Sequence, residues 1–180
     1  MLNEDQNAAP SPHKREGLYA TLDDYLDALS RRDPYAVPWA DFVFNTEDNV
    51  AIEVGDGLWG TITGLGDYQV RCADVKTGQV GYFGAVEETN ETSAFALRLK
   101  VDRDGRISEV ETIVVRIAFS GLDIFAEKSF WDKPILSEAV PPEKRVPRER
   151  MISIADGYFD ALHLNDGQIF TNFHPDCNRV

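Results

Sequence analysis

The chain has 180 residues, of which 31 are acidic and 18 are basic, so its formal net charge is -13 at pH 7. Such an excess of carboxylates repels the phosphates of nucleic acids and anionic membrane surfaces, which argues against either as a partner. The composition, 43% hydrophobic and 27% charged, is that of a globular protein, and no apolar run is long enough to cross a membrane.

Residues 1–17 are polar and contain Pro10 and Pro12, which predicts a disordered leader without the apolar core of a secretory signal. Cys72 and Cys177 lie about a hundred positions apart and indicate neither a disulfide framework nor a metal cluster. These features favour a cytoplasmic protein with reduced thiols.

The first periodic segment predicts a helix that starts near Thr21 as its N-cap. One face of this helix is apolar, and Pro34 ends it because proline disfavours the helical conformation in the preceding residue. The residues of the apolar face, at the spacing of one helix side, are Leu18, Leu22, Tyr25 and Leu29.

Residues 41–45 predict a short strand, and residues 50–54 extend it or pair with it. The glycine-rich passage from Gly55 to Gly66 matches neither a P-loop nor a dinucleotide-binding fingerprint, and it predicts tight turns around a buried Trp59. Three strands of an antiparallel meander follow, at residues 80–88, 93–102 and 106–117.

The dipeptide Asp104-Gly105 predicts a two-residue type I′ turn between the last two strands. A turn at Asn90-Glu91, between the first two of these strands, would place Phe83 beside Arg98. The register set by the Asp104-Gly105 turn puts opposite charges together on one face and apolar groups on the other, which supports the hairpin. Its pairs are Arg98 with Glu111, Lys100 with Glu109, Leu99 with Val110 and Leu97 with Thr112.

The pattern of the first helix returns near the end of the chain, at a constant offset of 133 residues. Residues 158–162 match residues 25–29 in four of five positions, on the helical face formed by Met151, Ala155, Tyr158 and Leu162. The sequence therefore predicts a domain over 18–117, an apolar and proline-rich connector over 118–147, and a truncated second copy over 148–180. We expect the connector to strap across the first domain, and the second helix to dock on that domain or on another chain.

Several stretches resemble an uncharacterised domain of bacteria and fungi from the nuclear-transport-factor-two-like, or SnoaL-like, superfamily. They are Gly57–Thr61, Gly78–Glu88, Leu97–Thr112 and, for a shortened second copy, Phe173–Val180. The resemblance implies an α+β fold in which a cone-shaped, curved antiparallel sheet packs against N-terminal helices, with a C-terminal helix from the truncated copy.

The resemblance also implies a small-molecule pocket between the sheet and the helices. A cofactor-independent isomerase, cyclase or lyase that acts on an apolar, oxygenated substrate by acid–base chemistry is the first functional hypothesis. The alternative is a non-catalytic module for ligand binding or for homodimerisation through the sheet. No metal-site spacing and no catalytic-triad motif is present, so neither a metal nor a cofactor is expected.

Ketosteroid isomerase-like members of that superfamily place a general-base carboxylate near the end of the first strand, where Glu47 is the available carboxylate. A base there would have to be desolvated, and a solvated turn residue is the alternative. Arg98 oriented by Glu111 could hold a carbonyl or a developing enolate, or the two could form an ion pair on the outer sheet face. The predicted ligand-binding residues are Trp59, Tyr68 and Phe83, with core or rim packing as the alternative for Trp59 and Tyr68.

Overall fold

The computed structural model describes residues 13–89, 91–116, 136, 138–171 and 173. The chain divides into two compact units, residues 1–132 and residues 133–180. Most of the predicted leader and connector lies outside the described residues. None of the described helices is long and apolar enough to cross a membrane.

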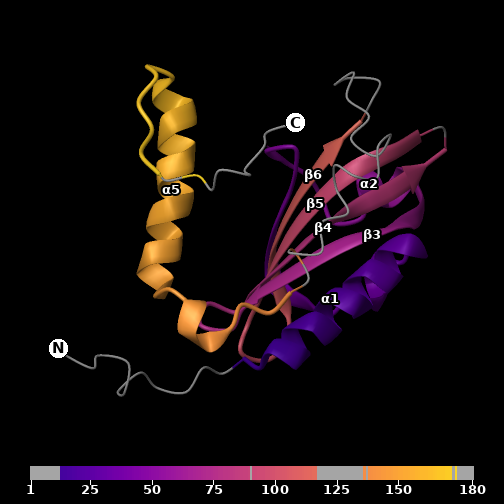
Figure 1. Ribbon diagram of the computed structural model, residues 1–180. Coiled ribbons are helices and arrows are strands. Elements are labelled where there is room, and N and C mark those ends of the chain that lie inside the picture. Colours follow the sequence, from indigo (N-terminus) through magenta and orange to yellow (C-terminus); the bar gives the residue numbers. More distant parts are fainter. Residues whose placement is uncertain (1–12, 90, 117–135, 137, 172, 174–180) are drawn as a thin grey trace. The chain divides into compact units, whose positions relative to one another are not determined.

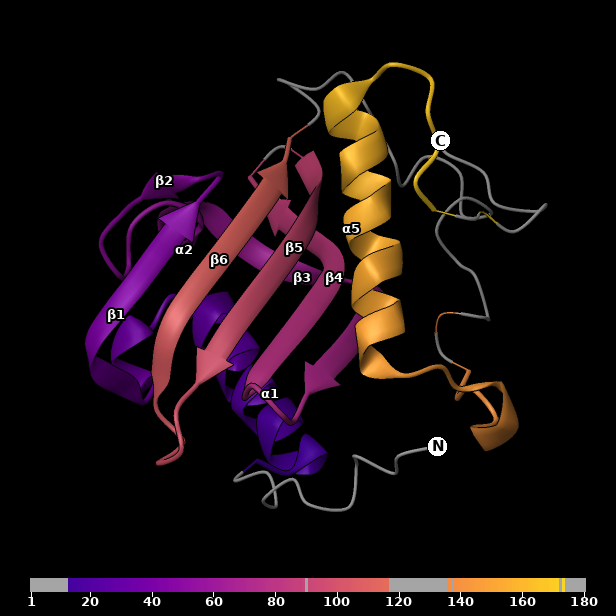
Figure 2. The ribbon, with the colours of Figure 1, turned by 90° about the vertical axis from the view of Figure 1, so that its left-hand side faces the viewer.

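The first unit is α+β, as predicted, with one long helix against a six-stranded sheet (Figure 1). The strand order is β2-β1-β6-β5-β4-β3, and Figure 2 shows the strands twisting and curving side by side. The sheet is mixed, because β1 runs parallel to β6 while all other pairs are antiparallel. The elements are α1 (Arg15–Ser30), η2 (Pro34–Ala36), β1 (Trp39–Glu47), β2 (Val50–Ala51), α2 (Leu58–Thr61), β3 (Ile62–Asp74), β4 (Gln79–Glu88), β5 (Glu91–Val101) and β6 (Ile107–Val115).

The helix α1 buries the face that its periodicity predicts, since Leu18, Leu22, Tyr25 and Leu29 are 0–2% exposed. These side chains pack against apolar groups of β3, β4 and β5, which defines the inner face of the sheet. The helix begins at Arg15, so Thr21 is not its N-cap. The Thr21 hydroxyl instead donates to the Gly17 carbonyl oxygen within the helix at 3.1 Å.

The β5–β6 hairpin has the predicted register but not the predicted turn. Arg98 pairs with Glu111 and Leu99 with Val110, whereas the loop contains three residues, Arg103 to Gly105. Gly105 is left-handed (φ 85°) and Asp104 is not, which excludes a type I′ turn. The register survives because Ser108 is an extra residue between the pairs Lys100–Glu109 and Val101–Ile107. The extra loop residue shifts the register by one position and the bulge shifts it back, so the predicted pairs are kept.

Two further predictions for the sheet are wrong. Phe83 lies opposite Ala96, not beside Arg98, which pairs with Gly81. The passage predicted as turns contains α2 and the beginning of the 13-residue strand β3. Trp59 is buried as predicted, at 5% exposure.

The second unit contains η4 (Pro142–Lys144) and α5 (Arg148–Leu164). The helix α5 begins 133 positions after α1, and Asn165 is left-handed (φ 45°), as is Arg32 at the same offset (φ 57°). The ring of Tyr158 lies edge-on to that of Phe173, with centroids 6.1 Å apart. Tyr25 meets Trp39 in the same way at 6.1 Å. These shared features support the proposal of a repeat.

Candidate functional site

The carboxylate of Glu47, the predicted general base, lies on the inner face at the end of β1. Its Oε2 atom accepts a hydrogen bond from the Leu58 backbone N–H at 2.7 Å, and its Oε1 atom is 3.5 Å from Nη2 of Arg116. The side chain is 14% exposed. Glu47 thus ties β1 to the N-terminus of α2, so the alternative of a freely solvated turn residue is wrong.

Arg116 is shared between Glu47 and Glu88. Its Nε and Nη2 atoms donate to the two carboxylate oxygens of Glu88 at 2.6 and 3.0 Å. Burial would raise the pKa of Glu88, but the hydrogen bonds from Arg116 and from the Thr61 hydroxyl outweigh it and lower that pKa. The result is an ion-paired cluster in which Arg116 links carboxylates from the ends of β1 and β4.

The space beside Glu47 is small. A cavity of about 10 Å³ separates Glu47 from Tyr25, Trp59 and Thr112, with Asn45 in its wall. A volume of this size holds at most one water molecule. Burial raises the pKa of Tyr25 above its usual value, so its hydroxyl stays protonated. Among the residues that the structure describes, the inner face is therefore closely packed around Glu47.

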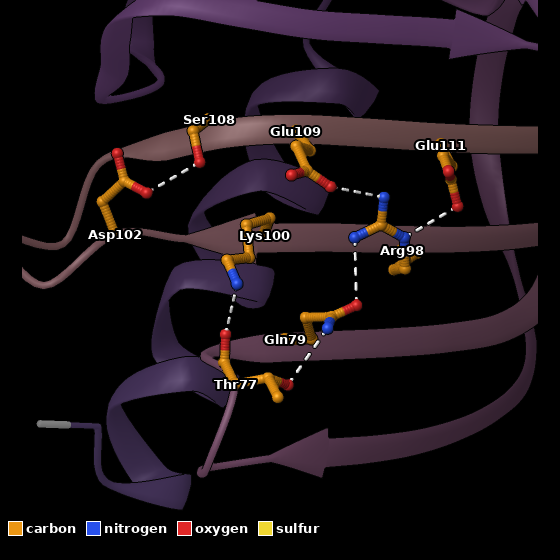
Figure 3. A network of polar contacts seen from close by, with 8 residues as sticks. All are labelled: Thr77, Gln79, Arg98, Lys100, Asp102, Ser108, Glu109 and Glu111. Carbon is orange, nitrogen blue, oxygen red and sulfur yellow. Dashed lines mark hydrogen bonds and ion pairs between the residues drawn. The ribbon is translucent and has the colours of Figure 1, made fainter. Parts of the chain in front are cut away.

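Arg98 and Glu111, the other predicted catalytic residues, lie on the opposite, outer face of the sheet (Figure 3). Arg98 donates to Glu111 and Glu109, both at 2.7 Å, and to the Gln79 side chain at 3.0 Å. The hydrogen bond to Glu111 is the main cause that raises the pKa of Arg98. The side chain of Glu111 is 51% exposed, so the arrangement is the outer-face ion pair that was the alternative.

The predicted catalytic residues do not converge. Glu47 pairs with Thr112 of β6, whose side chain is buried on the inner face, and successive residues of a strand point to opposite faces. Glu111 therefore points away from Glu47, and Arg98 lies beside Glu111.

The predicted ligand-binding residues are also separated. Trp59 packs edge-on against Tyr25, with ring centroids 5.5 Å apart, and belongs to the core. Tyr68 is half-buried in the irregular part of β3. Phe83 is 54% exposed on the outer face. These three side chains form no common pocket.

A groove of about 280 Å³ runs between α1 and β3. A bulge in β3 shapes it, since the residues between Leu65 and Gln69 outnumber those of β4 opposite them, and Gly66 lies over Ala85. Sequence reasoning missed the groove because it did not predict β3. The lining residues are Asp23, Leu26, Asp27 and Ser30 of α1, Leu65, Gly66, Gln69 and Arg71 of β3, and Tyr82 of β4.

Arg71 is the cation of this groove. Its Nη1 atom contacts Oδ1 of Asp23 at 2.5 Å, and its Nε atom donates to the Gln69 side chain at 2.9 Å. Tyr82 forms the inner wall and is 2% exposed. Burial raises the pKa of its hydroxyl, and the nearby Arg71 opposes that shift. The groove combines apolar walls with a few fixed polar groups.

Among the residues that the structure describes, no group of three or more His, Cys, Asp or Glu side chains could hold a metal ion. Cys72 is exposed.

A family model, "Domain of unknown function (DUF8021)", matches residues 144–180, which lie in the second unit. No curated protein matches the chain. Solved structures do match, and those described as NTF2-like or SnoaL-like are among them, as the sequence resemblance implies.

An NTF-2 like protein of unknown function from Burkholderia xenovorans shares 9% identity over 67% of this chain and 96% of its own, with a TM-score of 0.48. A SnoaL-like family protein from Agrobacterium tumefaciens shares 12% over 56% and 99%, with a TM-score of 0.40. An LEH-like epoxide hydrolase from M. tuberculosis shares 18% over 55% and 83%, with a TM-score of 0.40. A neighbour's activity does not pass to this chain at such distances.

Proposed function

We propose that the first unit is a small-molecule-binding module whose ligand lies in the groove between α1 and β3. The observation that carries this proposal is the difference in space between the two candidate sites, about 280 Å³ in the groove against about 10 Å³ beside Glu47. Ligand pockets usually measure about 300–1,000 Å³, so the groove suits a small ligand.

The lining of the groove supports binding rather than acid–base catalysis. Leu26 and Leu65 offer apolar contact, whereas the carboxylates are engaged by cations. Asp23 contacts Arg71, and Asp27 contacts Arg31 at 2.7 Å on the exposed helix surface. A general base needs a carboxylate oxygen that is free to accept a proton from the substrate, and here each carboxylate is already bound to a guanidinium group.

The isomerase, cyclase or lyase hypothesis requires a substrate at Glu47. That carboxylate already accepts the Leu58 amide, and the adjoining cavity has room for no more than a water molecule. Glu47 fits the role of a structural anchor better than that of a base.

A titration of the ¹⁵N-labelled full chain with small uncharged aromatic compounds tests the proposal. We expect amide resonances of Ser30, Gln69 and Arg71 to shift in a saturable way. Ser30→Trp should abolish these shifts by filling the groove, because Ser30 lines it from the last turn of α1. The control is Ser30→Ala, which removes only a hydroxyl that donates to the Leu26 carbonyl oxygen at 2.7 Å. Equal binding by both variants would refute the groove as the site.

The outer face favours a second function, homodimerisation through the sheet. Val70, Phe83, Ala96 and Ile113 are paired in register, so they form an apolar row across β3, β4, β5 and β6. Phe83 and Ile113 are 54% and 55% exposed. The adjoining row carries Arg98 and Glu111, which offers both signs of charge to a second copy related by a twofold axis.

Sedimentation velocity tests this interface. Phe83→Asp should shift the chain from dimer to monomer, because the new charge would be desolvated at the centre of the contact. Ala20→Asp, on the exposed side of α1, adds the same charge elsewhere and should leave the dimer intact. A wild-type chain that remains monomeric at high concentration would rule out this second function.

A further inference from the structure

The helix α5 carries a continuous apolar stripe on one side, formed by Met151, Ala155, Phe159 and Leu162 at the spacing of one helix face. The three large side chains of this apolar stripe are 42–65% exposed. At the offset of 133 residues, the corresponding side chains of α1 are 0–4% exposed. Contiguous exposed apolar groups of this kind mark interaction surfaces.

The segment that follows α5 covers a different side of the helix. It turns back along α5 (Figure 1), and Gly157 is buried where the backbone of Phe170 passes. A Cβ at Gly157 would lie 2.7 Å from the Phe170 carbonyl oxygen. Gly157 follows Ala155 by two positions, which places the two residues nearly opposite each other on the helix. This segment therefore leaves the apolar stripe open.

The charges of α5 are ordered along the chain, with cations at its beginning and carboxylates towards and beyond its end. A helix dipole favours the reverse order, so this arrangement is unfavourable within a single helix. It becomes favourable when the basic beginning lies beside the acidic end of a neighbouring helix. The cations are Lys144, Arg145, Arg148 and Arg150 and the carboxylates are Asp156, Asp160 and Asp166, with Glu149 and the neutral His163 as exceptions.

A second copy of α5 offers the complementary order of charges. In an antiparallel pair related by a twofold axis, each basic beginning lies beside the acidic end of the other helix, and the two apolar stripes face each other. A parallel pair would place like charges side by side. Ala155 lies close to the middle of α5, and its small side chain allows the two helices to approach closely.

We infer that α5 is a second dimer contact, in which the α5 helices of two copies pair antiparallel through their apolar stripes. The inference rests on the proposed dimer through the outer sheet face, because one stripe per copy is small beside the roughly 20–30 residues a side of a stable interface. Once the sheets hold two copies together, the α5 helices meet at a high effective concentration and add to the stability of the dimer.

Cross-linking of the full chain tests the pairing and its direction. The ends of the stripe, Met151 and the partner's Leu162, lie side by side in an antiparallel pair but about 16 Å apart along the axis in a parallel one. Met151→Cys and Leu162→Cys chains are prepared with Cys72→Ser and Cys177→Ser, so that each has one thiol. We expect a short bismaleimide to join the two variants when they are mixed, and to join neither variant to itself.

Sedimentation velocity measures what the contact contributes. Phe159→Asp places a carboxylate in the apolar stripe and should raise the dissociation constant of the dimer roughly tenfold. The matched control is Ser153→Asp, which adds the same charge to the exposed polar side of α5 and should leave the dissociation constant unchanged.

Each result supports or overturns the inference. If the wild-type chain is a dimer but the mixed variants are not joined, or Phe159→Asp weakens the dimer no more than Ser153→Asp, the α5 contact is overturned while the sheet dimer stands. Joining of Met151→Cys to itself would show a parallel pair and overturn the antiparallel arrangement. A wild-type chain that stays monomeric would remove the proposed dimer, and the α5 contact with it.

Discussion

Glu47 should behave as a structural anchor, and its removal should destabilise the first unit measurably. The 2.7 Å hydrogen bond from the Leu58 N–H goes to a charged acceptor that is 14% exposed on its side chain. Hydrogen bonds to charged groups contribute about 1.5–3 kcal/mol. The 3.5 Å contact with Arg116 adds little, because that guanidinium keeps both hydrogen bonds to Glu88. We therefore expect Glu47→Ala to lower the free energy of unfolding by about 2–3 kcal/mol.

Glu47→Gln refines the prediction. An amide oxygen can still accept the Leu58 N–H but carries no charge, so the expected loss is about 1 kcal/mol. Glu53→Ala is the matched control, since the Glu53 side chain is exposed and surface substitutions usually change stability by less than about 0.5 kcal/mol.

Urea denaturation followed by tryptophan fluorescence measures these changes, because Trp59 is buried in the first unit. With a typical urea slope of about 1–3 kcal/mol per M, Glu47→Ala should lower the midpoint by about 1 M or more. A Glu47→Ala midpoint no lower than that of Glu53→Ala would refute the anchoring role and reopen the case for Glu47 as a catalytic group.

Two further predictions concern the same unit. Gly57→Ala should lower the free energy of unfolding by more than about 1 kcal/mol, because Gly57 is left-handed (φ 62°) and a Cβ there would collide with the Glu47 carboxylate. The change is measured as a fall in melting temperature. Gly17→Ala is the control, because this helical position has open space and the substitution should not lower the melting temperature. The pKa of Glu88 is lowered in the folded state, so Glu88 stabilises the fold above the ordinary carboxyl pKa, and this stabilisation is lost as pH falls through the folded-state pKa. Glu88→Gln should therefore be less stable than wild type at pH 7. The urea midpoints of the two proteins should converge in acid.

The parts of the fold that the sequence predicts are those set by local periodicity. The buried face of α1 follows from the spacing of Leu22 and its neighbours, because a helix side repeats every three to four residues. The register of β5 and β6 follows from matching charged and apolar faces, and it holds even though the loop differs. Pairing of side chains constrained that register more strongly than turn chemistry did.

The strand β3 was missed for physical reasons. Its first half contains Gly64 and Gly66, residues typical of turns, and its polar positions are tolerated because it is an edge strand of the sheet. A type I′ signal was also missed: Asp48 and Asn49, both left-handed, join the paired residues Glu47 and Val50. The groove depends on the β3 bulge, so it could not be predicted before the strand was.

The candidate site depends on contacts between distant segments. The resemblance predicted a carboxylate, Glu47, near the end of the first strand, and the structure places it there on the inner face. That Arg98 and Glu111 lie on the other face depends on the parallel pairing of β1 with β6, which local sequence patterns do not encode. Arg116 and Glu88 reach Glu47 from two other strand ends, and no motif links the three residues.

The proposed repeat shows why the same residue pattern can give different environments. Leu22 in α1 is fully buried, whereas Met151 and Leu162 on the corresponding face of α5 are 54% and 42% exposed. The periodicity of α5 indicates an apolar face that could cover a sheet. In α1 the corresponding face packs against β3, β4 and β5. Because isolated helices of this length are marginally stable in water, α5 needs its apolar face packed for full stability. A helix under this constraint is suited to docking, so the docking of α5 on another surface stays a prediction.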